Sequence, residues 1–105
     1  MRLGLRRRGR HPDEAETQEW AQAEIERLRS VSYTELLDQR EAPVHYAIRS
    51  RSGRQLMGET YVFWDGGEHG PLRVMIDVCE PRPGIMRSIA SGDFIRTPDG
   101  SFVGE

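Results

Sequence analysis

The chain has no lysine, no asparagine and only one cysteine. All fifteen of its lysine-or-arginine residues are therefore arginines. Lysine and asparagine are both encoded by A-rich codons, so their absence predicts a GC-rich bacterial genome as the source. A single cysteine, Cys79, excludes an intrachain disulfide and a cluster of several thiolates on one metal. These absences favour a reducing, cytoplasmic compartment.

Long apolar runs are also missing. No stretch approaches the roughly 18 apolar residues that cross a bilayer, and no apolar segment follows the basic start. We therefore expect no membrane anchor, no signal peptide and no membrane partner. The 105 residues are 36% hydrophobic, and the apolar ones recur in patterned runs from Trp20 onward. This length and pattern predict a single domain over residues 13–105.

Charge divides the chain into two unequal parts. Residues 1–12 hold five arginines and no acid, whereas the rest holds ten arginines and 17 acidic residues, a formal net charge of −7. Residues 1–12 are predicted to be a flexible basic tail, which offers a candidate phosphate-binding arm for nucleic acid at Arg6, Arg7, Arg8 and Arg10. Because the tail has no aromatic residue to stack on bases, a solvated tail is the alternative.

Two helices are expected at the start of the domain. Asp13 with Glu16, and then Ser32 with Glu35, have the spacing of capping boxes. The first predicted helix runs from Asp13 to about residue 30, with apolar residues at helical spacing. The second runs from Tyr33 to about residue 40 and ends before Pro43.

From residue 44 the apolar pattern alternates, which predicts strands at 44–49 and 72–79, and a run of β-forming residues predicts a strand between them at 55–65. Gly58 suggests a bulge in the second strand. Pro81, Pro83 and Gly84 are expected to break the ladder, with a helical turn or irregular lid over residues 85–89. A last hairpin is predicted at 93–97 and 101–103. The expected class is α+β, with one or two helices packed on an antiparallel meander of four to five strands, in which a cystatin-like two-layer arrangement is an option.

Residues 32–105 resemble a group of small uncharacterised bacterial proteins with a similar C-terminal segment. The resemblance rests on Ser32-Tyr33-x-Glu35-Leu36-Leu37, Val62-Phe63-Trp64-Asp65, Leu72-Arg73-Val74 and Asp93-Phe94-Ile95-x-x-Pro98-Asp99-Gly100-Ser101-Phe102-Val103-Gly104-Glu105. It implies one domain, and it implies no chemistry because the group has no assigned function.

The sequence shows no recognisable catalytic, metal or cofactor motif. Cys79 has no histidine at a telling distance, so we expect a partly buried or edge-strand thiol rather than a nucleophile. The cluster Asp65, Glu68 and His69 is expected to solvate a turn. The loop glycines Gly66, Gly67 and Gly70 lack the context of a phosphate-binding loop. On the third strand Arg73, Asp77 and Cys79 share one face, which predicts an ion pair or an interface patch.

The aromatic residues Tyr61, Phe63 and Trp64 are the candidates for a pocket or an interface, with packing in the core as the alternative. The leading hypothesis is a non-enzymatic protein-binding module that docks a partner or a second copy of itself. The alternatives are a nucleic-acid-associated accessory protein that uses the arginine arm and a small-molecule-binding domain. An acidic domain of this size also fits an inhibitor of a basic toxin.

Overall fold

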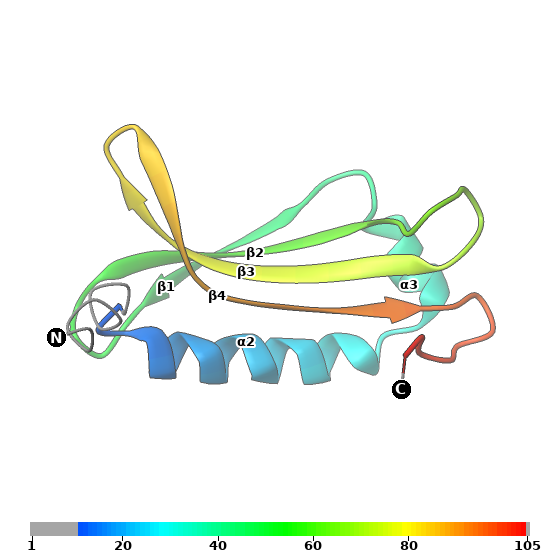
Figure 1. Ribbon diagram of the computed structural model, residues 1–105, viewed down its shortest axis with the longest axis horizontal. Coiled ribbons are helices and arrows are strands. Elements are labelled where there is room, and N and C mark those ends of the chain that lie inside the picture. The colour runs from blue at the N-terminus through cyan, green and yellow to red at the C-terminus, as the bar shows by residue number, and fades with distance from the viewer. Residues whose placement is uncertain (1–10, 105) are drawn as a thin grey trace, which may run out of the picture.

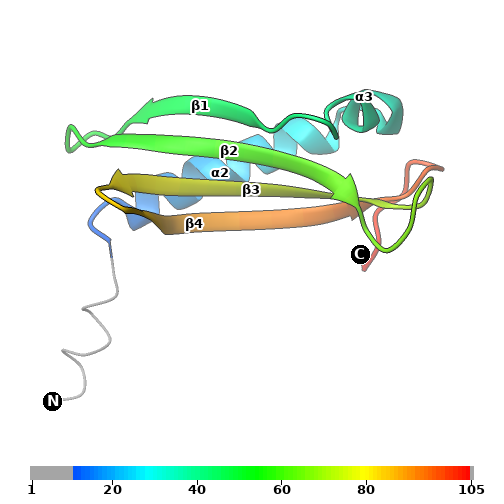
Figure 2. The ribbon, with the colours of Figure 1, turned by 90° about the horizontal axis from the view of Figure 1, so that it is seen from above.

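The computed structural model describes residues 11–104 and contains two helices followed by four strands. The strands form one antiparallel sheet in the order β1-β2-β3-β4, so they lie side by side in chain order (Figure 2). This confirms the predicted α+β class with an antiparallel meander. The elements are α2 (Glu14–Arg29), α3 (Tyr33–Asp38), β1 (Val44–Arg49), β2 (Gln55–Trp64), β3 (Leu72–Arg82) and β4 (Ile85–Arg96).

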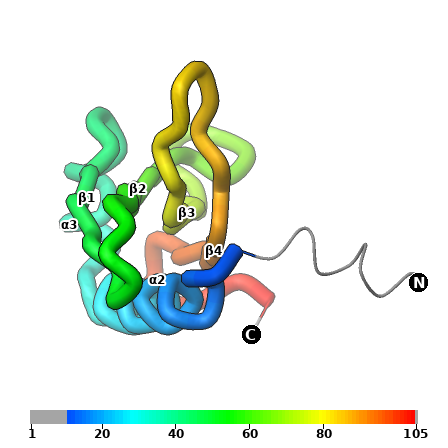
Figure 3. Tube along the Cα trace, turned by 90° about the vertical axis from the view of Figure 1, so that its left-hand side faces the viewer, coloured from blue at the N-terminus to red at the C-terminus, as the bar shows by residue number. Residues whose placement is uncertain are grey.

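The long helix α2 runs along one face of the sheet, and α3 lies at one end of it (Figures 1 and 3). The core lies between α2 and the strands, because the alternating residues of β3 that face the helix are fully buried: Leu72, Val74, Ile76 and Val78. From α2, Ala21 and Leu28 complete this layer. Neither helix in the described part of the chain is long and apolar enough to cross a membrane.

Two strand glycines let α2 approach the sheet closely. A Cβ atom on Gly58 would lie 2.6 Å from the Trp20 ring, and one on Gly92 would lie 2.4 Å from the Ile25 side chain. Gly58 pairs in unbroken register with Tyr46 on β1, so the predicted bulge at this glycine is wrong. The glycine is there because a backbone without a side chain leaves room for the indole.

The two predicted capping boxes differ in outcome. Ser32 caps α3 as predicted, because its hydroxyl accepts a hydrogen bond from the Glu35 N–H at 3.1 Å. Asp13 precedes α2 but its side chain makes no capping hydrogen bond. Its carboxylate instead accepts from the Ser52 hydroxyl at 2.9 Å, in the β1–β2 turn. The first capping box is therefore wrong, because a tertiary partner competes for the same oxygens.

The expected break after Cys79 is also wrong. β3 continues through Pro81 to Arg82, and β4 starts at Ile85, so residues 83 and 84 form a hairpin turn. The prolines are tolerated because this hairpin projects beyond the rest of the sheet, away from α2 (Figure 1). A register shift lies between Val78 and Cys79, where Ile89 is the extra residue on β4.

The predicted C-terminal hairpin is reduced to an isolated bridge between Arg96 and Phe102. The segment that contains this bridge contacts the end of α2, because the Arg96 guanidinium donates to the carbonyl oxygens of Arg29 at 2.9 Å and Val31 at 3.0 Å. These carbonyls lie just where the helix ends and leaves its last acceptors unpaired. Arg96 therefore joins the C-terminal turn to the end of α2.

His11 belongs to the packed structure, although it falls within the predicted tail of residues 1–12. Its ring is buried, accepts a hydrogen bond from the Asp13 N–H at Nδ1, and lies 2.9 Å from Glu80 on β3 through Nε2. Because Nδ1 accepts, Nε2 carries the proton and donates to the carboxylate. The contact fixes the start of α2 against the sheet.

Candidate functional site

The face of the sheet that points away from α2 has no helix over it in the described part of the chain (Figures 1 and 3). We call it the open face. Because side chains alternate along a strand, its residues are the neighbours of the buried ones. They include His45, Ala47 and Arg49 on β1; Gln55, Met57, Glu59, Tyr61 and Phe63 on β2; Arg73, Met75, Asp77 and Cys79 on β3; and Ser88, Ser91, Asp93 and Ile95 on β4.

The antiparallel register brings acidic groups together at the centre of this face. Glu59 lies directly opposite Asp77, and His45 lies opposite Glu59 on its other side. Cys79 follows Asp77 by two residues and therefore points to the same side. The donor atoms of Glu59, Asp77 and Cys79 all lie within 4.8 Å of one another. We call these three residues the thiol–carboxylate cluster.

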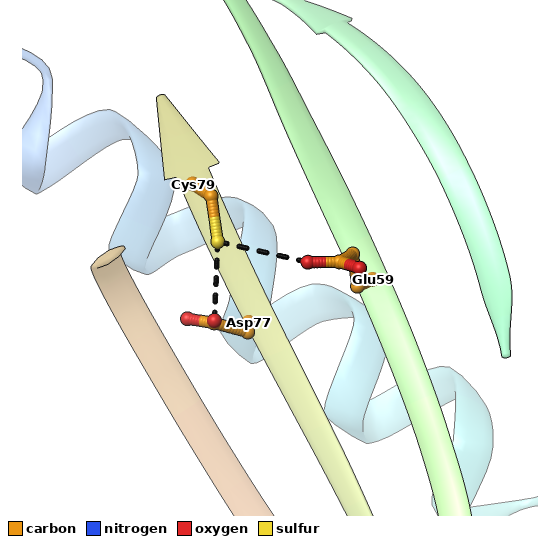
Figure 4. Close-up of side chains that lie close together, drawn as sticks. All are labelled: Glu59, Asp77 and Cys79. Atoms are coloured by element: carbon orange, nitrogen blue, oxygen red, sulfur yellow. Dashed lines mark hydrogen bonds between the residues drawn. The ribbon is translucent and has the colours of Figure 1, made fainter. Parts of the chain in front are cut away.

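Within the cluster the thiol lies between the two carboxylates (Figure 4). Cys79 Sγ lies 3.1 Å from Asp77 Oδ2 and 3.7 Å from Glu59 Oε1, and it donates to both. The Cys79 residue is only 4% exposed, although it lies on the open face. The sequence expectation of a partly buried or edge-strand thiol is corrected in one respect, because β3 is an interior strand of the sheet.

The outer oxygens of both carboxylates have partners of their own. Ser88 donates to Asp77 Oδ1 at 2.7 Å. Tyr61 donates to Glu59 Oε2 at 2.5 Å, and His45 Nε2 lies 3.0 Å from the same oxygen. Each carboxylate is therefore held by one oxygen while the other oxygen points at the thiol.

The protonation of the thiol follows from these neighbours. Burial, together with the negative charge and hydrogen bonds of Asp77 and Glu59, raises the pKa of the Cys79 thiol to about 12. Donation to Glu59, with burial as a second cause, raises the pKa of Tyr61 to about 12. Both groups keep their protons at neutral pH, so Cys79 in this arrangement is not a neutral-pH nucleophile.

The structure separates the three aromatic candidates of β2. Tyr61 and Phe63 share the open face, where Phe63 is 40% exposed. Trp64 points to the helix side and packs against the core. Its ring lies 5.0 Å from the Arg40 guanidinium and 5.6 Å from the His69 ring. A single pocket lined by all three residues is therefore wrong, because successive strand residues point to opposite faces.

Apolar surface surrounds the cluster on the open face. Met57 precedes Glu59 on β2, and Tyr61 and Met75 form the next cross-strand pair. A groove of about 350 Å³ lies beside the cluster and is lined by His45, Ala47, Met57 and Pro81 with neighbouring residues of β1 and β2. At the hairpin tip Ile85 and Met86 are 62% and 44% exposed.

The other residues singled out in the sequence do not join this cluster. Arg73 forms ion pairs with Asp65 at 3.0 Å and with Asp93, which replaces the predicted pairing with Asp77. Glu68 and His69 are strongly exposed in the β2–β3 loop, as expected of a solvated turn. The arginine arm, Arg6, Arg7, Arg8 and Arg10, lies outside the described residues.

A second concave region lies between α2 and the first two strands. It measures about 410 Å³ and is lined by residues that include Trp20, Ile48 and Leu56. Ser50, also in its lining, is buried at the end of β1. This is where the predicted small-molecule pocket between helix and sheet would lie.

No family model matches the chain, and neither the curated proteins nor the solved structures contain a match. The residues of the open face are therefore the basis for assigning a function. The resemblance of residues 32–105 to small bacterial proteins stays a prediction.

The thiol–carboxylate cluster was not predicted from the sequence. Spacing along one strand places Asp77 beside Cys79, but Glu59 joins them only through the β2–β3 register. Pairing the two strands outward from the loop at residues 65–71 would have found this register, since Trp64 then faces Leu72 and Glu59 faces Asp77.

Proposed function

We propose that the chain is a protein-binding module and that its open face is the docking surface. The observation that carries this proposal is the uncovered face of a four-stranded sheet whose opposite face packs on α2. When only one face of an antiparallel sheet is covered, the residues on the other face usually are polar and point to water. Here Tyr61 pairs with Met75 and Phe63 follows Tyr61 on the same face of β2, while Met57 lies on the other side of Glu59.

The pattern of this face matches the anatomy of a binding surface. Aromatic residues and methionine are enriched where proteins dock, and Phe63 stands exposed among them. Charged groups, including Arg73 and Asp93, flank this apolar region. We infer that a partner buries the Tyr61 and Phe63 region as the centre of the contact.

Net charge supports a basic partner. Residues 13–105 carry a formal net charge of −7, and opposite charge accelerates association of two proteins. The partner is therefore expected to present an apolar centre with arginine or lysine at its rim. An inhibitor of a basic toxin is one protein of this kind.

The strand β1 offers an alternative site for self-association. It has no strand neighbour on its outer side among the described residues, so its backbone groups could pair with β1 of a second copy. This alternative places the interface at the sheet edge and leaves Phe63 exposed. It differs from docking on the open face in the residue whose change abolishes binding.

Co-purification tests the proposal with three variants of the tagged chain. Full-length protein, Phe63→Glu and the control Glu19→Gln, on the exposed side of α2, are incubated with nuclease-treated lysate of the natural source. Docking on the open face predicts that one protein is retained by the wild type and the control and lost by Phe63→Glu. Equal retention by all three would contradict it.

A version that starts at His11 separates the arm from the body. It removes residues 1–10 and keeps the buried contact of His11 with Glu80. A partner that docks on the open face is retained by this version. Loss of all binding on this truncation, with binding that falls steeply with salt, would point to the nucleic-acid alternative instead.

A further inference from the structure

The thiol–carboxylate cluster combines three metal-binding groups from two strands. Glu59 and Asp77 are directly paired across β2 and β3, and Cys79 is two residues along from Asp77. Like charges directly opposite in a sheet are destabilising. A protonated thiol between them relieves this only weakly, because a thiol is a poor hydrogen-bond donor.

The distances inside the cluster suit a cation between the three donors. In a tetrahedral zinc site with Zn–S of about 2.3 Å and Zn–O of about 2.0 Å, the sulfur and each oxygen are about 3.5 Å apart. Cys79 Sγ lies 3.1 Å from Asp77 Oδ2 and 3.7 Å from Glu59 Oε1. These two sulfur–oxygen separations lie on either side of the tetrahedral value, and all three donor atoms lie within 4.8 Å of one another, so side-chain rotations would bring them to one ion.

The surrounding contacts are those of an oriented ligand set. Metal-binding carboxylates are commonly held through a second hydrogen bond by neighbouring groups. Ser88 holds Asp77 Oδ1, and Tyr61 with His45 holds Glu59 Oε2. These partners come from β4, β2 and β1, outside the three donors, and they leave the inward oxygens directed at the thiol (Figure 4).

We propose that Cys79 Sγ, Asp77 Oδ2 and Glu59 Oε1 bind a thiophilic divalent cation of the zinc class. The sulfur ligand disfavours Mg²⁺ and Ca²⁺, which prefer oxygen ligands alone. On binding, the thiol proton passes to solvent and the sulfur electron pair bonds the metal. This inference does not depend on the docking proposal.

Cobalt and zinc titrations of untagged, chelator-treated full-length protein test the site. Co²⁺ bound to a cysteine sulfur gives a sulfur-to-metal charge-transfer band in the near ultraviolet. We expect this band to saturate at one Co²⁺ per chain and to be displaced by Zn²⁺. Absence of the band at saturating Co²⁺ would overturn the proposal, and this readout requires no variant to fold.

Matched variants identify the ligands. Cys79→Ser removes the sulfur, and Glu59→Gln and Asp77→Asn each remove one carboxylate while keeping its shape. We expect the charge-transfer band to vanish in Cys79→Ser, and zinc affinity in calorimetry to fall by about tenfold or more in each variant. Asp93→Asn is the control on the same face, because its carboxylate pairs with Arg73 instead. An unchanged zinc affinity in Cys79→Ser, or an equal loss in Asp93→Asn, would refute the assignment.

Discussion

Glu59 and Asp77 stand directly opposite each other at the centre of the sheet, with the Cys79 thiol donating to both carboxylates. Like charges directly opposite in a sheet destabilise it, and the thiol between these two acids is only a weak hydrogen-bond donor. Their pairing is therefore the feature of the open face from which we infer a metal site. If the cluster binds zinc as we propose, zinc also stabilises the folded chain.

The first prediction concerns this pair in the presence and absence of zinc. With a chelator present, Asp77→Asn relieves the repulsion and is expected to raise the free energy of unfolding by up to about 1 kcal/mol. With zinc present, the wild type is expected to become the more stable protein, because a ligand that binds only the folded state stabilises it. Urea denaturation under both conditions measures this reversal. The same order in both conditions would contradict the metal assignment.

The second prediction concerns the close approach of α2 to the sheet. Gly58→Ala places a methyl group 2.6 Å from the Trp20 ring. Because a packed indole cannot move aside freely, we expect a loss of about 1–3 kcal/mol in urea denaturation. Gly67→Ala is the control, since nothing lies within 4 Å of its added Cβ. Equal stability of the two variants would show that α2 can shift at no cost.

The third prediction concerns the end of α2. Arg96→Met removes the two hydrogen bonds to the carbonyl oxygens of Arg29 and Val31 but keeps most of the side-chain volume. Hydrogen bonds from a charged donor contribute about 1.5–3 kcal/mol, so we expect a loss of that order in thermal or urea unfolding. The exposed Arg51→Met serves as control and should stay within about 0.5 kcal/mol. If Arg96→Met left the free energy of unfolding unchanged, this would mean that water replaces the guanidinium.

The fourth prediction concerns acid unfolding at the C-terminal turn. Hydrogen bonds from the Thr97 hydroxyl, and then from the Ser101 N–H and hydroxyl, lower the pKa of Asp99 from 3.8 to about 2. A depressed pKa in the folded state means that this contribution is full above about pH 4. It is lost as the pH falls toward about 2.

Asp99→Asn removes that contribution at every pH. The stability difference between wild type and Asp99→Asn should therefore be constant above about pH 4 and shrink from there to about pH 2. Urea unfolding at several pH values measures it, with the exposed Glu41→Gln as the comparison. A difference that grows with acidity would contradict the assigned hydrogen bonds.

Much of the fold could be predicted from local pattern. Residues 44–49 alternate in polarity and residues 55–64 are rich in β-forming residues, and the two segments form β1 and β2 within one residue of the predicted bounds. Ser32 and Glu35 predict the start of α3 because the capping contact is local. In each case the determining interaction lies within a few residues along the chain.

The errors came from contacts between distant residues. The Asp13 carboxylate binds the Ser52 hydroxyl instead of capping its own helix. Gly58 is needed for the close packing of Trp20 on α2, not for a bulge. Pro81 and Pro83 predict an end to the sheet, but the β3–β4 hairpin that contains them extends beyond the other strands. The thiol–carboxylate cluster was missed for the same reason, because it exists only once β2 and β3 are paired.

Site-specific photo-cross-linking tests the docking surface most directly. A photo-reactive residue replaces either Phe63 on the open face or Glu19 on the exposed side of α2, and each protein is irradiated in lysate of its natural source. We predict one specific cross-linked partner from position 63 and none from position 19. Cross-links from position 19 alone, or from no position, would contradict docking on the open face.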